Sequence, residues 1–123
     1  MLEFAKLKEL YDYSLELGME PLVEINNIDE LKLAVELDCK IIGVNNRNLN
    51  NFNVDLNTTK LIKDSLIDNG GEKDRILISL SGINTKEDIA DYKKSGINGF
   101  LIGEALMRKG DKVGEFINEL VNA

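Results

Sequence analysis

The chain has 123 residues, with 15 Lys and Arg against 22 Asp and Glu, so its formal net charge is −7. This length fits one compact domain over residues 1–123, and 43% hydrophobic with 30% charged residues excludes a disordered chain. No apolar run approaches the ~20 residues that span a bilayer, and the acidic balance without a basic cluster argues against nucleic acid or a membrane as partner.

The first half of the chain alternates between helical and strand patterns. Apolar residues at helical spacing predict a helix over residues 2–17. A strand over residues 21–25 begins at a proline, which cannot continue a helix. Asn27 or Asp29 can cap the next helix. The consecutive apolar residues within 40–46 then predict a strand that is covered on both faces.

The second half continues the same alternation. The segment from Thr85 to Asp88 resembles a capping box and predicts the start of a helix. The other predicted elements are a polar Asn-rich loop over residues 47–57, a helix over 56–66, strands over 75–79 and 99–103, and a last helix over 113–121. Four strands therefore alternate with five helices.

This alternation, with its short connections, predicts parallel strands joined by right-handed crossovers. Two folds have this pattern. One is an open, doubly wound sheet, and the other is half of a (β/α)8 barrel, which needs about 250 residues when complete. Periodicity alone does not separate the two.

In parallel α/β proteins, functional groups gather at the carboxyl ends of the strands. Glu24 ends an apolar strand, where a carboxylate is costly to bury unless it is paired or used. A partly exposed acid at the end of a strand is the structural alternative. Arg47 stands among asparagines after the second strand, where a guanidinium can hold an anion or a hydroxyl. Asparagines also form turns without any such role.

The third and fourth strands end in glycine-containing turns. After the third strand, Ser81–Gly82 offers backbone N–H groups to an anion, although a glycine there also suits the geometry of a turn. After the fourth strand, Gly103–Glu104 is a weaker signal, because an acid simply suits the start of a helix. No dinucleotide-binding motif, P-loop or nucleophile elbow is present.

Three motifs together resemble one family. The segments GVNNRNL (43–49), SGI (81–83) and FLIGEALMR (100–108) closely resemble indole-3-glycerol-phosphate synthase of tryptophan biosynthesis. The resemblance extends over nearly the whole chain and implies the C-terminal half of that (β/α)8 barrel, from its fourth helix through its eighth. It therefore implies a TIM-barrel-derived (βα)4 half-barrel with four parallel strands and an extra N-terminal helix, in place of the doubly wound sheet.

The resemblance also implies roles for residues near the first two strands. Glu24 matches a fifth-strand glutamate that acts as a general base or proton relay in ring closure. Asn45 matches an asparagine that holds a substrate hydroxyl, which makes Glu24 and Asn45 the catalytic candidates. Arg47 matches an arginine that helps to orient the substrate.

The last two strands match the part of the family's site that binds phosphate. Ser81 matches a substrate-binding residue of the seventh-strand turn, and Gly82 contributes to the phosphate site. Gly103 and Glu104 match the eighth-strand turn, whose backbone N–H groups complete that site. The expected ligand is therefore a phosphorylated small molecule.

Two departures from the family pattern bear on activity. Leu80 stands where the family usually has a glutamate that lines the active site. The family's catalytic lysines, including its general acid, and a further glutamate lie on its first three strands, which this chain does not contain. We therefore expect the chain to be inactive alone. Either it needs a separate N-terminal half, or it is a stand-alone scaffold, natural or engineered, that binds phosphate compounds. A phosphate-binding barrel of another biosynthetic step would share the glycines but not GVNNRNL.

Half a barrel leaves two sheet edges unpaired, at residues 22–25 and 100–103, and bare edges invite association. We expect either a homodimer or higher oligomer, in which the last strand of each copy pairs with the first strand of the other, or a complex with an N-terminal half-barrel. The chain has no histidine and no cofactor motif, so neither a metal nor a cofactor is expected. Cys39 is the single cysteine, and a reducing compartment, the cytoplasm, is the expected location.

Overall fold

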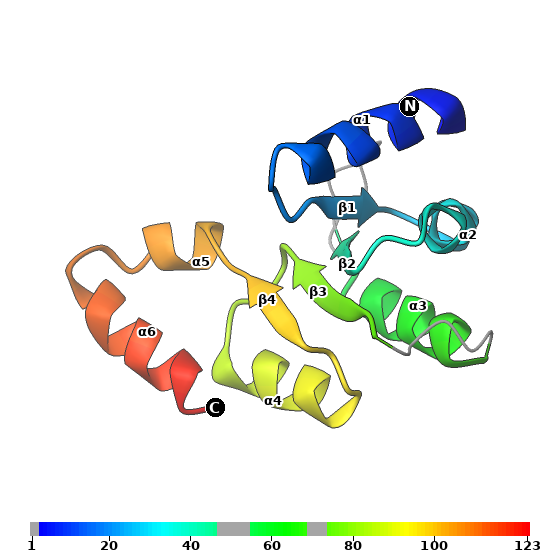
Figure 1. The fold of residues 1–123 in the computed structure, drawn as a ribbon. Coiled ribbons are helices and arrows are strands. Elements are labelled where there is room, and N and C mark those ends of the chain that lie inside the picture. Colours follow the sequence, from blue (N-terminus) through cyan, green and yellow to red (C-terminus); the bar gives the residue numbers. More distant parts are fainter. Residues whose placement is uncertain (1–2, 47–54, 69–73) are drawn as a thin grey trace.

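The computed structural model describes residues 3–46, 55–68 and 74–123. Its four strands form one sheet in the order β1-β2-β3-β4, and every pairing is parallel (Figure 1). The strands are β1 (Leu22–Ile25), β2 (Ile41–Asn45), β3 (Ile76–Leu80) and β4 (Gly99–Leu101). The predicted parallel, four-stranded arrangement is confirmed.

Helices connect and flank the strands. They are α1 (Phe4–Glu16), α2 (Ile28–Leu37), α3 (Asn57–Asp68), α4 (Lys86–Lys94), α5 (Glu104–Met107) and α6 (Val113–Val121), with a short 3-10 turn η1 (Gly110–Lys112). None of the described helices has the length and apolar character needed to cross a membrane.

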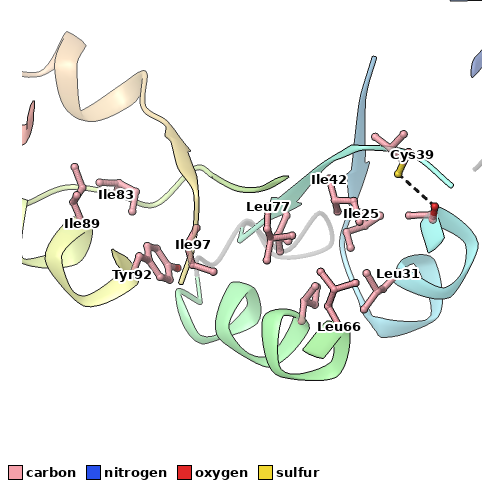
Figure 2. Packing of buried hydrophobic residues seen from close by; sticks show 14 of the residues in the cluster. Ile25, Leu31, Cys39, Ile42, Leu66, Leu77, Ile83, Ile89, Tyr92 and Ile97 are labelled. Atoms are coloured by element: carbon pink, nitrogen blue, oxygen red, sulfur yellow. Dashed lines mark hydrogen bonds between the residues drawn. The ribbon is translucent and has the colours of Figure 1, made fainter. Parts of the chain in front are cut away.

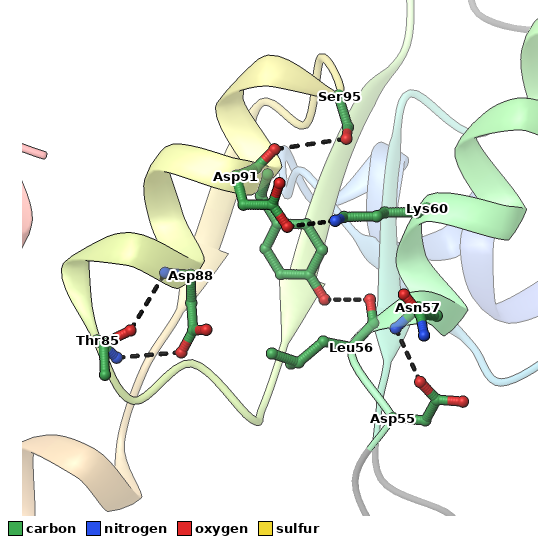
Figure 3. Close-up of polar contacts among 9 residues, drawn as sticks. Asp55, Leu56, Asn57, Lys60, Thr85, Asp88, Asp91 and Ser95 are labelled. Carbon is green, nitrogen blue, oxygen red and sulfur yellow. Dashed lines mark hydrogen bonds and ion pairs between the residues drawn. The ribbon is translucent and has the colours of Figure 1, made fainter.

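Local hydrogen bonds explain where two of these helices begin. The Asn27 side chain accepts a hydrogen bond from the Glu30 N–H at 2.9 Å, so Asn27 caps α2, and Asp29 lies inside the helix. At α4, Thr85 and Asp88 form the predicted capping box, in which each side chain accepts from the other residue's backbone N–H (Figure 3).

The sequence prediction placed the end of the fourth strand too late. The strand was expected to reach residue 103, but β4 ends at Leu101, and its pairing with β3 covers only residues 78–80 of that strand. The carbonyl of Leu101 accepts from the Ser81 N–H at 3.4 Å, after which the chain leaves the sheet and enters α5.

The face of the sheet that is covered by helices carries the core. Its strand residues include Ile42 and Val44, which are fully buried, and Leu77, which is nearly so. Figure 2 shows Ile42 and Leu77 packed beside Leu66 of α3 and Leu31 of α2. Burial of each such side chain stabilises the fold by ~1.5–3 kcal/mol. We call this the outer face, because it is the helix-covered side of a half-barrel.

The opposite face, called the inner face below, is open. Leu22, Ile76 and Leu101 of this face are 44%, 47% and 62% exposed. At its centre lies Gly43, where an added Cβ would come within 2.8 Å of side-chain carbons of both Leu22 and Leu80. The side chains of the two leucines thus occupy the space above the glycine, on the side of the sheet that would face the middle of a barrel.

The two edges of the sheet are also open. In the described structure β1 pairs only with β2, and β4 pairs only with β3. Helix α1 lies beside β1 (Figure 1), but Tyr11 is its only buried residue. A groove of about 540 Å³ remains between α1, β1 and α2, and the open edge of β1 borders it.

Candidate functional site

Glu24 and Asn45 meet at the carboxyl ends of neighbouring strands. The parallel register places Glu24 of β1 opposite Gly43 of β2, so Asn45 lies two residues further along β2 on the same inner face. The Asn45 amide donates a hydrogen bond to the Glu24 carboxylate at 3.2 Å. Glu24 is exposed, so its carboxylate is available to a ligand on the inner face. The structure thus brings the two predicted catalytic residues together, and their roles stay predictions.

Arg47, the third residue predicted for this part of the site, lies outside the described residues. The description of the β2 end stops at Asn46.

The turn after β3 has an unusual backbone. Ser81 and Gly82 both adopt the left-handed conformation, with φ of 69° and 84°. Glycine enters this region without steric cost, but a side chain such as that of Ser81 costs about 1–3 kcal/mol there. The Gly82 carbonyl accepts a hydrogen bond from the Asn84 amide at 3.1 Å. Within the described part of the chain, the N–H groups of Gly82 and Ile83 have no hydrogen-bond partner.

A pocket of about 550 Å³ lies between this turn and the one after β4. Its walls bring together Ser81, Gly82, Gly103 and Glu104, the four residues predicted for substrate and phosphate binding. Arg108, on the turn of chain that follows α5, also lines the pocket and forms an ion pair with the exposed Glu104 carboxylate. Since that carboxylate would repel an anion, only the backbone N–H of Glu104 suits the predicted role.

Leu80 lies between the two parts of the site. Its side chain is buried and contacts the space above Gly43 on the inner face. In the sheet register Leu80 lies directly opposite Asn45. The position that the family pattern assigns to a glutamate therefore presents a hydrocarbon surface beside the Glu24–Asn45 pair.

A buried polar cluster under the site was missed by sequence reasoning. Asn46 is 2% exposed, and its side chain is hydrogen-bonded to Thr59 of α3, Ser79 of β3 and the backbone of Ser81. Nearby, the Tyr92 hydroxyl donates to the Leu56 carbonyl at 2.5 Å, and burial raises the pKa of Tyr92. By residue type alone, Asn46 is indistinguishable from the turn-forming asparagines that surround it in the sequence. Its position directly after a strand of consecutive apolar residues was the available sign that it is buried.

Metal ligands are not gathered anywhere in residues 3–46, 55–68 and 74–123, where no group of three His, Cys, Asp or Glu side chains is placed to hold an ion. Cys39 is buried, donates to the Ala34 carbonyl at 3.4 Å (Figure 2), and has a pKa raised by burial.

Comparison of folds shows that the chain resembles part of a TIM barrel. It superposes on flavocytochrome b2 bound to benzoylformate with a TM-score of 0.70 at 13% identity, and this match covers 97% of the chain and 30% of that protein. A mandelate oxidase with benzoyl-formic acid gives the same TM-score at 12% identity, over 99% of the chain and 38% of that protein. At this identity the likeness concerns the fold alone, and it confirms the half-barrel prediction.

Comparison of sequences identifies the family. The multifunctional tryptophan biosynthesis proteins of Schizosaccharomyces pombe and Phanerodontia chrysosporium are 48% identical over 122 residues and 47% identical over 117 residues. These matches cover 99% and 95% of the chain, which spans only 15% and 14% of those proteins. The family model for indole-3-glycerol phosphate synthase matches residues 1–120, and the chain therefore belongs to the indole-3-glycerol phosphate synthase family.

Proposed function

We propose that this chain supplies the phosphate-binding half of an indole-3-glycerol-phosphate synthase barrel. The reaction is the decarboxylative closure of the indole ring on the anthranilate-derived carboxyphenylamino deoxyribulose phosphate. The observation that carries the proposal is the pocket between the Ser81–Gly82 turn and the Gly103–Glu104 turn, at the carboxyl ends of β3 and β4.

The pocket suits an anion even though the chain has a net charge of −7. Backbone N–H groups that are oriented in advance stabilise a phosphate dianion without any local positive side chain. The N–H groups of Gly82 and Ile83 are without protein partners in the described residues, and Arg108 adds a cation at the wall of the pocket. The phosphate of the substrate would sit between the two turns.

The reacting part of the substrate would extend from this pocket toward β1. Glu24, exposed on the inner face, would act as the general base or proton relay, and Asn45 would hold a hydroxyl of the substrate. Their mutual hydrogen bond of 3.2 Å fixes the direction of the carboxylate before the substrate binds. Arg47, which matches an arginine of the family, would help to orient the substrate.

The chain alone would lack the general acid of the reaction. The family resemblance places the catalytic lysines on three strands that precede the segment present here. General acid catalysis contributes about 10²–10⁴-fold to a rate, so the substrate bound to this chain alone would not react at a useful rate.

The open edges and the inner face suit a partner that supplies four more strands. One candidate is the complementary N-terminal half of the same barrel. Another is a second copy of the chain, because a two-fold axis would pair β4 of each copy with β1 of the other and leave no edge unpaired. In both cases Leu22, Ile76 and Leu101 would become buried.

Fluorescence of the newly formed indole ring tests the proposal. The purified chain should give no signal from the carboxyphenylamino deoxyribulose phosphate, and addition of a separately produced N-terminal half should restore it. A Glu24→Gln variant in the same mixture should lower the rate by about 10²-fold or more, because it removes the base. Full activity of the Gln variant would refute the role of Glu24.

A second candidate function is a stand-alone half-barrel that oligomerises and binds phosphate compounds without catalysis. Leu80 favours this candidate, because a hydrocarbon side chain replaces an acid beside Glu24 and Asn45. Leu80→Glu separates the two: it should increase the rate of the complemented enzyme if catalysis is the function. Absence of activity in every mixture, with phosphate binding retained, would favour the scaffold.

A further inference from the structure

The side chain of Asn46 connects the turn after β3, which forms one wall of the candidate site, to helix α3. Its Nδ2 donates to the Ser81 carbonyl at 3.1 Å and to the Ser79 hydroxyl at 2.8 Å. Its Oδ1 accepts from the Thr59 hydroxyl at 2.7 Å, which fixes the orientation of the amide.

The backbone of Asn46 is held as well. Its N–H donates to the Leu80 carbonyl at 3.1 Å, and its carbonyl accepts from the Asp55 N–H at 2.9 Å. Every polar group of this buried residue therefore has a partner, and a fully satisfied buried polar network is rigid. Asn46 joins the ends of β2 and β3 to the start of α3.

The hydrogen bond to Ser81 has a geometric consequence for the pocket. The Ser81 carbonyl and the Gly82 N–H belong to one planar trans peptide unit, so they point in opposite directions. While Asn46 holds the carbonyl toward the core, the Gly82 N–H is directed away from it. Gly82 lines the pocket and Asn46 does not, so the N–H is directed to the pocket side.

The same bond helps to keep Ser81 in an unfavourable conformation. A serine at φ 69° lies in the left-handed region, and such a residue persists only where its surroundings hold it. In the described residues the hydrogen bonds that hold the Ser81 backbone are the one from Asn46 to its carbonyl and the longer one, at 3.4 Å, from its own N–H to Leu101.

We infer that Asn46 is a positioning residue that sets the Ser81–Gly82 peptide for anion binding and couples the Ser81–Gly82 turn to the end of β2 and the start of α3. The inference rests on the proposed function, because it assigns a purpose to the same pocket. Asn46 itself does not touch the ligand.

The test compares two variants by titration with inorganic sulfate, whose charge is constant between pH 5.5 and pH 8, followed by NMR of the backbone amides. Asn46→Asp keeps the shape of the side chain but, when ionised, has no hydrogen to donate to Ser81. Ser79→Ala is the matched control, because it removes another partner of the same Nδ2 and leaves the bond to Ser81.

We expect sulfate to shift the Gly82 and Ile83 amides of the parent chain. At pH 8 Asn46→Asp should bind sulfate about tenfold more weakly or worse, whereas Ser79→Ala should stay within about twofold of the parent. At pH 5.5 the affinity of Asn46→Asp should recover, because burial raises the pKa of a carboxyl and its protonated form can donate to Ser81 again. The parent and Ser79→Ala at both pH values control for other groups near Asn46, which include Tyr92 and Asp55.

The outcomes are distinct. Unchanged sulfate affinity of Asn46→Asp at pH 8, or a weakened affinity without recovery at pH 5.5, overturns the positioning role and leaves the pocket intact. Absence of any sulfate shift at Gly82 in the parent chain overturns the phosphate site, and the inference with it. Should Asn46→Asp not fold at pH 8, the parent chain alone decides: its Asn46 side-chain amide must shift with the same dissociation constant as the Gly82 amide, and a static Asn46 signal refutes the coupling.

Discussion

The two faces of the sheet differ sharply. On the outer face, Ile42, Val44 and Leu77 are buried against helices, and their buried neighbour Ser79 accepts a hydrogen bond from Asn46 within the polar cluster. On the inner face, Leu22 and Leu101 remain about half exposed or more, and the edges of the sheet have no partner in the described residues. The difference indicates that the outer face stabilises the chain, while the inner face is left accessible, as the proposed ligand and partner strands require.

The largest expected effect is on the outer face. Ile42→Ala should lower the free energy of unfolding by about 2–5 kcal/mol, because it leaves a cavity in a fully buried position. Ile67→Ala, at an exposed position of α3, is the control and should cost less than about 1 kcal/mol. Urea denaturation followed by circular dichroism measures both. Equal losses would mean that the outer face is not the core of the protein.

Phosphate binding should give the next largest effect, in the pocket between the turns that follow β3 and β4. A ligand that binds only the folded state stabilises it by RT ln(1 + [L]/Kd), about 2.7 kcal/mol at a hundredfold excess over Kd. Phosphate should therefore raise the Tm of the parent chain. Gly82→Asp should abolish the increase, because its carboxylate repels phosphate and blocks close approach. An equal increase in the variant would place the anion elsewhere.

The cap of α4 should have a smaller effect, confined to the outer layer. Thr85→Ala removes the side chain that accepts from the Asp88 N–H and should cost about 1 kcal/mol of stability. Asp29→Ala, in the first turn of α2 but outside its cap, should cost clearly less. Thermal unfolding of the two variants measures the difference. A larger loss for Asp29→Ala would show that the caps are assigned to the wrong residues.

The smallest expected effect concerns an ion pair between neighbouring helices of the outer layer. Lys60 of α3 contacts Asp91 of α4 (Figure 3), and its hydrogen bond holds the pKa of Asp91 below the usual value. The contribution of the pair is therefore complete above the ordinary aspartate pKa of about 3.9 and is lost as the pH falls through the lower pKa of the folded state. Lys60→Met should therefore lower the stability slightly at pH 7, where the contribution is complete, and lower it less at a pH below the folded-state pKa of Asp91, so that the stability curve flattens in the acid range. A change at acid pH as large as the change at pH 7 would contradict this assignment.

Sequence reasoning found the strands and the sheet because consecutive apolar residues, such as those of β2, read directly as buried strands. It left Asn27 and Asp29 as equal caps, because both residue types accept hydrogen bonds and only the backbone geometry selects between them. It missed the role of Asn46, whose partners Thr59 and Ser79 lie 13 and 33 residues away in the sequence. The left-handed conformation of Ser81 was equally hidden, because a serine gives no sign of it.

The most direct test of the contrast between the two faces is sedimentation velocity of the purified chain at micromolar concentration. We expect a dimer or a larger oligomer, because another copy would cover the open edges of β1 and β4 and the apolar inner face when no N-terminal half is present. Leu101→Asp should shift the protein toward the monomer, whereas Val121→Asp, at an exposed position on α6, should leave the oligomer unchanged. A monodisperse monomer of the parent chain would contradict the claim that its inner face requires four more strands.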